Sequence, residues 1–142
     1  MEKNRKHFRK RDAILSYLRH TDQHPSAETV YAELKKEIPD LSLGTVYRNI
    51  ALFKQQGLIQ SLGNINGVER FDGTVVPHVH FVCSECGEIR DLTQLHVPQL
   101  LCDKAASEAE AVVEQCMLTF LGTCSACVGN EQHINMEKEK LS

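Results

Sequence analysis

The chain has 142 residues, enough for one ordinary domain or two small ones, and its formal net charge is −3. No run of about 18 apolar residues occurs, which excludes a transmembrane helix, and the basic start continues into a charged amphipathic segment instead of a signal-peptide core. We therefore expect a cytoplasmic protein with no membrane partner, in which disulfides rarely persist.

Charge is unevenly spread along the chain. Residues 1–72 carry 12 Lys and Arg against 9 Asp and Glu, whereas residues 73–142 carry 4 against 10. A basic half joined to an acidic half favours an anion-binding module followed by a module with another task, although a difference this small also fits ordinary surface variation.

Three amphipathic helices are predicted in the first half, over residues 9–20, 27–38 and 43–56, because apolar residues recur there at helical spacing. Ser26 and Ser42 are placed to cap the second and third helices, Pro39 to end the second and Gly57 to end the third. The residues expected on the buried faces are Ile14, Leu15, Leu18, Val30, Leu34, Ile38, Val46, Ile50 and Phe53.

A two-stranded hairpin follows the helices, because Asn66-Gly67 in "LIQSLGNINGVERFD" is a strong turn signal between two short strands. Three helices and a hairpin indicate a winged helix-turn-helix, whose third helix enters the DNA major groove. The exposed residues of that helix that we expect to contact DNA are Thr45, Tyr47, Arg48 and Lys54. The alternative is a small helical domain with a solvated charged face.

The second half is predicted to mix strands with a helix. "HVHFVC" alternates as a strand does, "EIRDL" is a second strand, residues 98–113 form a helix that starts at Pro98, and "VVEQCMLTFLGTC" is a third strand. The tail after Val128 is polar.

Two C-x-x-C pairs, Cys83/Cys86 and Cys124/Cys127, predict a tetrahedral Zn(Cys)₄ site, in which four thiolates leave no open position and the metal is structural. The alternative is a redox dithiol. Cys102 and Cys116 stand apart from both pairs and are explained most simply as small buried apolar residues.

His78 and His80 are not needed by that closed site. They are expected on one face of their strand, and Asp72 and Asp91 are near in sequence. Two imidazoles with carboxylates suit Fe(II), Mn(II), Co(II) or Zn(II), so a second metal site is predicted; the alternative is a polar strand face without metal.

Together the stretches "HPSAETVYAELKKEIPDLSLGTVYRNIALFKQQGLI", "RFD", "HVHFVCSECGEIRDL" and "GTCSAC" resemble the ferric uptake regulator superfamily over essentially the whole chain. The resemblance implies an α+β fold, with a winged helix-turn-helix DNA-binding domain over residues 1–72 and an α/β dimerisation domain with the Zn(Cys)₄ site and a polar tail over residues 73–142. It also implies a homodimeric, non-enzymatic repressor of operator DNA with no small-molecule substrate.

The resemblance further implies that structural Zn²⁺ is accompanied by a regulatory Fe²⁺ or Mn²⁺. The ligands that match the family's regulatory positions are His24, Asp72, His78, His80 and Asp91. Aspartate at both carboxylate positions is most similar to the peroxide-responsive members, where His24 and His78 are the expected oxidation targets. A further metal site of some members is expected to be absent or altered, since Cys116 stands where its His belongs.

The resemblance thus implies a metal-dependent, peroxide-sensing repressor that binds palindromic operators and is released by metal-catalysed His oxidation or metal loss. A metal shared by His24 and the second-half ligands is expected to clamp the two halves in one DNA-competent arrangement. One alternative is an iron- or manganese-responsive repressor without peroxide sensing. Another, from a different class, is a thiol oxidoreductase or metalloenzyme, for which no Ser-His-Asp set is visible.

Overall fold

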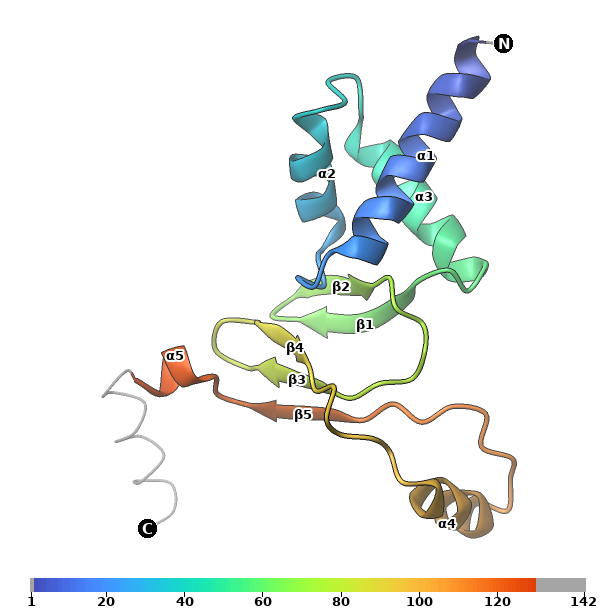
Figure 1. The fold of residues 1–142 in the computed structure, drawn as a ribbon, viewed down its shortest axis with the longest axis vertical. Coiled ribbons are helices and arrows are strands. Elements are labelled where there is room, and N and C mark those ends of the chain that lie inside the picture. Colours follow the sequence, from blue (N-terminus) through green and yellow to red (C-terminus); the bar gives the residue numbers. More distant parts are fainter. Residues whose placement is uncertain (1, 130–142) are drawn as a thin grey trace. The chain divides into compact units, whose positions relative to one another are not determined.

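The computed structural model describes residues 2–129, and the chain divides between Val76 and Pro77 into two compact units. The first unit holds α1 (Glu2–His20), α2 (Ala27–Lys35), α3 (Leu43–Gln55), β1 (Gln60–Ile65) and β2 (Val68–Asp72), as Figure 1 shows. This is the order of a winged helix-turn-helix.

Helices α2 and α3 begin where the capping signals predict. The Ser26 hydroxyl accepts a hydrogen bond from the Thr29 amide at 3.2 Å, and the Ser42 hydroxyl accepts one from the Thr45 amide at 3.1 Å. Two predicted boundaries were wrong. Helix α1 begins at Glu2 instead of Arg9, because its extra turns are rich in the good helix formers Lys and Arg. Helix α2 ends at Lys35, well before Pro39.

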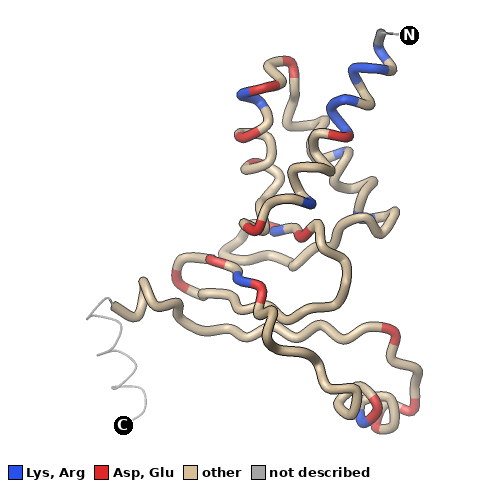
Figure 2. Tube along the Cα trace, viewed as in Figure 1, with Lys and Arg blue, Asp and Glu red and all other residues tan. Residues whose placement is uncertain are grey.

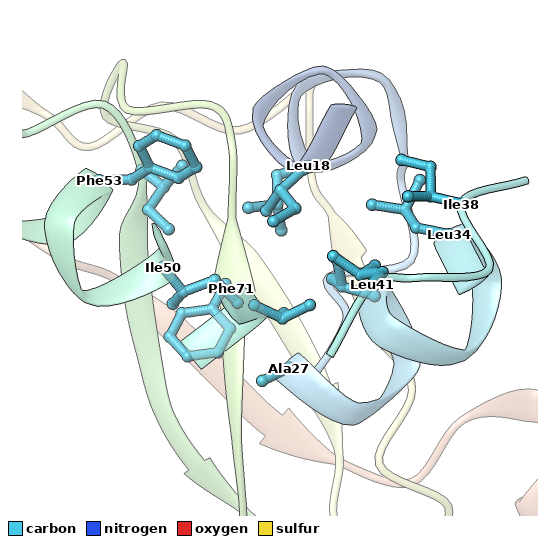
Figure 3. Packing of buried hydrophobic residues seen from close by; sticks show 12 residues of the cluster. Leu18, Ala27, Leu34, Ile38, Leu41, Ile50, Phe53 and Phe71 are labelled. Atoms are coloured by element: carbon cyan, nitrogen blue, oxygen red, sulfur yellow. The ribbon is translucent and has the colours of Figure 1, made fainter. Parts of the chain in front are cut away.

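One apolar core joins the three helices to the hairpin. Figure 3 shows its side chains converging from all three helices, with Phe71 of β2 among them. The predicted helix faces are confirmed as part of this core, with Leu15 at its margin: Ile14, Leu18, Val30, Leu34, Ile38, Val46, Ile50 and Phe53 are buried.

The hairpin turn lies at Asn66 and Gly67, whose φ angles of 54° and 82° are those of a type I′ turn, as predicted. Strand β2 ends next to Gly73, which packs against the backbone of α1. A Cβ added to Gly73 would lie 2.3 Å from the Leu18 carbonyl oxygen, so the close approach of hairpin and helix requires glycine.

The second unit contains a three-stranded sheet in the order β4-β3-β5. Strand β3 (His80–Cys83) pairs antiparallel with β4 (Ile89–Asp91) and parallel with β5 (Thr119–Gly122). Helices α4 (Gln99–Ala109) and α5 (Ser125–Val128) complete it.

Three boundaries here were also wrong. His78 precedes β3 instead of belonging to it, α4 ends at Ala109 because Glu110 turns left-handed (φ 51°), and β5 covers only part of its predicted apolar stretch. Several residues before β5 are apolar but exposed, and Val112 is 87% exposed. The apolar character of this stretch therefore did not indicate a strand. The polar tail beyond Gly129 lies outside the described residues.

Candidate metal centres and DNA-contacting helix

The four paired cysteines form one cluster in the second unit. Cys83 ends β3, and the tight turn after it is closed by the Gly87 amide, which donates to the Cys83 carbonyl at 2.9 Å. Cys124 stands at the start of α5. Because β3 and β5 pair with Cys83 opposite Gly122, the two C-x-x-C turns meet at the same end of the sheet.

The sulfur positions fit zinc. The four Sγ atoms lie within 4.8 Å of one another, and those of Cys86 and Cys124 are 3.7 Å apart. A tetrahedral ion with Zn–S bonds of about 2.3 Å needs sulfurs about 3.8 Å apart. All six cysteines are free thiols. The set therefore suits one Zn²⁺ with no open position, as expected of a structural site.

Backbone amides favour the thiolate form of one of these cysteines. The Cys124 amide donates to Cys83 Sγ at 3.3 Å, and the amides of Cys86 and Cys124 lower the pKa of the Cys83 thiol to about 6. The thiol of Cys127 is the opposite case: its hydrogen bond to Cys124, with burial, raises its pKa to about 12. Four crowded sulfurs become thiolates together only with a cation among them.

A second set of ligand-type side chains in the same unit surrounds Asp91. His80 of β3 lies opposite Asp91 of β4 in the strand pairing. One carboxylate oxygen of Asp91, Oδ1, is 3.1 Å from His78 Nε2 and 3.2 Å from His80 Nε2. The two imidazole centroids are 4.2 Å apart. His78 therefore joins its partners although it lies just outside the strand.

The first unit brings His24 and Asp72 together. His24 Nε2 lies 3.5 Å from Asp72 Oδ2, and the two side chains are only 3% and 6% exposed. The other oxygen of Asp72 accepts a hydrogen bond from the Thr74 amide at 2.8 Å, which fixes the carboxylate. A buried imidazole beside a buried carboxylate is a suitable pair of ligands for a divalent transition metal.

Arg70 holds the loop that carries His24, a role that the sequence did not reveal. Its guanidinium donates to the carbonyl oxygens of His24 and, at 2.9 Å, of Gln23. The Phe71 amide adds a bond to the Pro25 carbonyl at 3.0 Å. His24 itself has a left-handed φ of 49°, which is uncommon for a residue with a side chain. Strand β2 thus supplies Asp72 and also anchors the loop that carries His24.

Of the residues predicted to contact DNA, Tyr47, Arg48 and Lys54 are exposed on α3 and Thr45 is half-buried. Tyr47 is 46% exposed, and its hydroxyl donates to the Glu28 carboxylate, which lowers the pKa of Glu28 and raises the pKa of Tyr47. Arg48 donates to the Thr45 hydroxyl at 3.2 Å. Tyr47, Thr45 and Arg48 thus share the first turns of the helix.

Lys54 lies near the other end of α3 and is engaged with the hairpin. Its ammonium group is 2.9 Å from the Glu69 carboxylate, and this hydrogen-bonded ion pair lowers the pKa of Glu69. The same ammonium group lies over the Phe71 ring. Helix α1 adds a basic segment. The predicted helix start at Arg9 had left the first part of this segment outside the helix. Figure 2 shows its Lys and Arg gathered toward the start of the chain. These residues are Lys3, Arg5, Lys6, Arg9, Lys10 and Arg11.

A winged helix-turn-helix unit joined to a sheet unit with a four-cysteine cluster suited to zinc, together with histidine–carboxylate pairs, defines a class of metal-responsive regulators. Residues 2–120 match the ferric uptake regulator family, and the chain belongs to that family. No helix within residues 2–129 has the length and apolar character needed to cross a membrane.

Similar proteins include peroxide regulators. The chain is 35% identical over 127 residues to the peroxide operon regulator of Bacillus subtilis, covering 87% of this chain and 84% of the relative. It is 33% identical over 121 residues to the peroxide-responsive repressor PerR of Staphylococcus epidermidis, covering 82% and 77%.

Solved structures have the same fold. The Campylobacter jejuni peroxide stress regulator superposes with a TM-score of 0.74 at 27% identity, covering 89% of this chain and 94% of that one. The Helicobacter pylori ferric uptake regulator gives a TM-score of 0.73 at 19% identity, covering 87% and 82%, and supports the fold alone. The predicted α+β fold and family are therefore confirmed.

Proposed function

We propose that this protein is a metal-dependent, peroxide-sensing transcriptional repressor that binds palindromic operator DNA as a homodimer. The observation that carries the proposal is the use of aspartate in both histidine–carboxylate sets, together with the likeness to peroxide regulators. Under this proposal the protein is a regulator and not an enzyme, and it binds a structural Zn²⁺ and a regulatory Fe²⁺ or Mn²⁺.

The regulatory ligands in this proposal are His24, Asp72, His78, His80 and Asp91. Their assignment to one ion rests on the positions they share with the family's motifs. Support comes from each unit separately, since His24 lies beside Asp72 and both other histidines lie beside Asp91. Three borderline imidazole donors together with two hard carboxylate donors suit Fe(II) and Mn(II).

In this proposal the short Asp91 side chain limits how its carboxylate can bind a regulatory metal. Its single oxygen Oδ1 reaches both imidazoles, and its short arm is held on β4. Fe(II), when bound, supplies the electrons that reduce peroxide and generate an oxidant of nearby imidazoles. In this proposal His24 and His78 take up the added oxygen, become poorer ligands and thereby lower the affinity of the site for metal.

DNA recognition is assigned to α3, with Thr45, Tyr47 and Arg48 near its start and Lys54 near its end. Arg48 is exposed and can donate to guanine or to phosphate. Lys54 is available to phosphate only if it leaves Glu69 or bridges both. The basic residues of α1 are suited to phosphate contacts and to faster encounter with DNA.

The second unit is the proposed dimerisation surface. Strand β5 is an edge strand of the sheet, so the backbone groups on its outer side are available to a second copy. Large apolar side chains are exposed on and near β5 and on α4, including Leu121 at 77% and Leu100 at 63%. Exposed apolar groups on an open edge favour pairing with an identical strand.

The test is a DNA-binding titration of the zinc-loaded protein with Fe(II), Mn(II) and added Zn(II), each with and without hydrogen peroxide. We expect Fe(II) and Mn(II) to support operator binding, and peroxide to release only the Fe(II) form, with one added oxygen on His24 or His78. Metal-dependent binding that peroxide leaves unchanged would favour an iron- or manganese-responsive repressor. Peroxide or disulfide turnover without DNA binding would favour an oxidoreductase.

A further inference from the structure

Cys102 and Cys116 form a second thiol pair, separate from the zinc cluster. Both side chains are half-buried, and both line one cavity of about 490 Å³ within the second unit. Other walls of this cavity come from Leu92, Leu95 and His96. None of the four zinc-cluster cysteines borders it.

The local fold explains how a cysteine on α4 and a cysteine in the segment after it come together. Helix α4 ends in a left-handed turn at Glu110, and the Ala111 amide donates back to the Ala106 carbonyl at 3.0 Å. From Cys102 to this turn the helix rises roughly 12 Å at 1.5 Å per residue. Six residues of extended chain reach up to roughly 20 Å, enough to return Cys116 to the level of Cys102.

The two thiols influence each other at this cavity, which both of them line. Burial, followed by the nearby charge of Cys116, raises the pKa of the Cys102 thiol. Among residues 2–129, no third histidine, cysteine or carboxylate joins the pair in a group of metal-ligand geometry. The pair therefore has the properties of a dithiol and not of a third metal site.

We propose that Cys102 and Cys116 are a second oxidation site, at which hydrogen peroxide converts the two thiols to an intrachain disulfide. The Cys116 thiolate attacks one peroxide oxygen, so that an S–O bond forms, the O–O bond breaks and water leaves after protonation. The Cys102 thiolate then attacks the Cys116 sulfur, forming the S–S bond and releasing the second water. Two thiols lose two hydrogens, and the peroxide is reduced to two waters.

The order of attack follows from the surroundings of the sulfurs. Burial and the neighbouring sulfur disfavour the thiolate of Cys102, so it suits the second, resolving step. The disulfide would close a short loop between α4 and the approach to β5. This chemistry uses neither His24 nor a regulatory metal, so it goes beyond the proposed histidine oxidation.

The experiment treats the zinc-loaded, otherwise metal-free full chain with hydrogen peroxide, then alkylates free thiols and digests with trypsin. Cleavage after Lys104 separates Cys102 from Cys116. We expect peptide 91–104 to be linked to peptide 105–138, which carries Cys116 together with Cys124 and Cys127, and fragmentation to assign the link to Cys116. The linked mass should be lower by two hydrogens, and reduction should restore both thiols. Non-reducing gels should show the link within one chain.

The matched controls are Cys102→Ser and Cys116→Ser, neither of which removes a zinc-cluster thiol. In Cys102→Ser, Cys116 should be captured by a sulfenic-acid reagent, and in Cys116→Ser the cross-linked peptide should be absent. The proposal is overturned if both thiols remain fully alkylatable after peroxide, if the link joins two chains, or if Cys116→Ser still links peptide 91–104 to a zinc-cluster cysteine. None of these outcomes depends on operator binding or on regulatory iron.

Discussion

The anchoring of the His24 loop by Arg70 can be tested by Arg70→Gln. The change removes the guanidinium that donates to the Gln23 and His24 carbonyls, while Phe71 and its bond to Pro25 remain. Hydrogen bonds from charged donors contribute about 1.5–3 kcal/mol each when well buried. Arg70 is only partly buried, so we expect a loss of about 2 kcal/mol for the two together, roughly a 30-fold change in an equilibrium constant.

The sequence offers a selective probe for this measurement. All three tyrosines lie in the first unit, and the chain has no tryptophan, so tyrosine fluorescence in a urea titration reports the first unit alone. Arg70→Gln should lower its unfolding midpoint. It should also weaken Mn(II) binding by up to the same 30-fold, because a less restrained loop presents His24 less often in its left-handed conformation.

Arg90→Gln is the matched control. Arg90 also lies on a strand, but its guanidinium is mostly exposed and pairs with Glu88 at 2.8 Å on the surface. Exposed surface pairs contribute little to stability, so Arg90→Gln should change neither the unfolding midpoint nor the Mn(II) affinity appreciably. If the two variants behave alike in both the urea titration and the Mn(II) titration, Arg70 does not position the His24 loop.

Cys83→Ser should lose zinc and unfold the second unit, since structural zinc contributes about 10–16 kcal/mol in zinc-finger peptides; full zinc content by atomic absorption would contradict this. Arg48→Ala should weaken operator binding by about 1–3 kcal/mol at one base position without altering Mn(II) affinity, which footprinting on base-substituted operators can check. Asp91→Glu should keep Fe(II)-dependent DNA binding but respond poorly to peroxide. The longer carboxylate can bind through both oxygens and so fill the position that peroxide needs. A wild-type response in gel shifts would refute this. Gly73→Ala should destabilise the first unit by about 1–3 kcal/mol, because its Cβ meets helix backbone, whereas Gly44→Ala meets only a flexible side chain and should be nearly neutral in the same urea titration.

The sequence by itself determined the elements whose causes are local. Ser26 and Ser42 cap helices through bonds to amides three residues away, and Asn66-Gly67 forms a turn because these residues accept positive φ. Each C-x-x-C turn likewise presents two sulfurs together. These features depend on a few neighbouring residues, so pattern alone suffices, whereas the joining of the two turns into one cluster also requires the pairing of β3 with β5.

Other features depended on partners distant in the chain, and only the tertiary structure decided them. The bond from Arg70 to the His24 loop spans 46 residues, and no spacing rule relates the two. Asp91 meets both histidines because β3 and β4 pair in one particular register. Cys102 and Cys116 meet at one cavity because of where α4 ends, and the left-handed turn at Glu110 that ends it has no glycine to signal it. In each case the energy of the contact is gained only after long-range packing has brought the chain segments together.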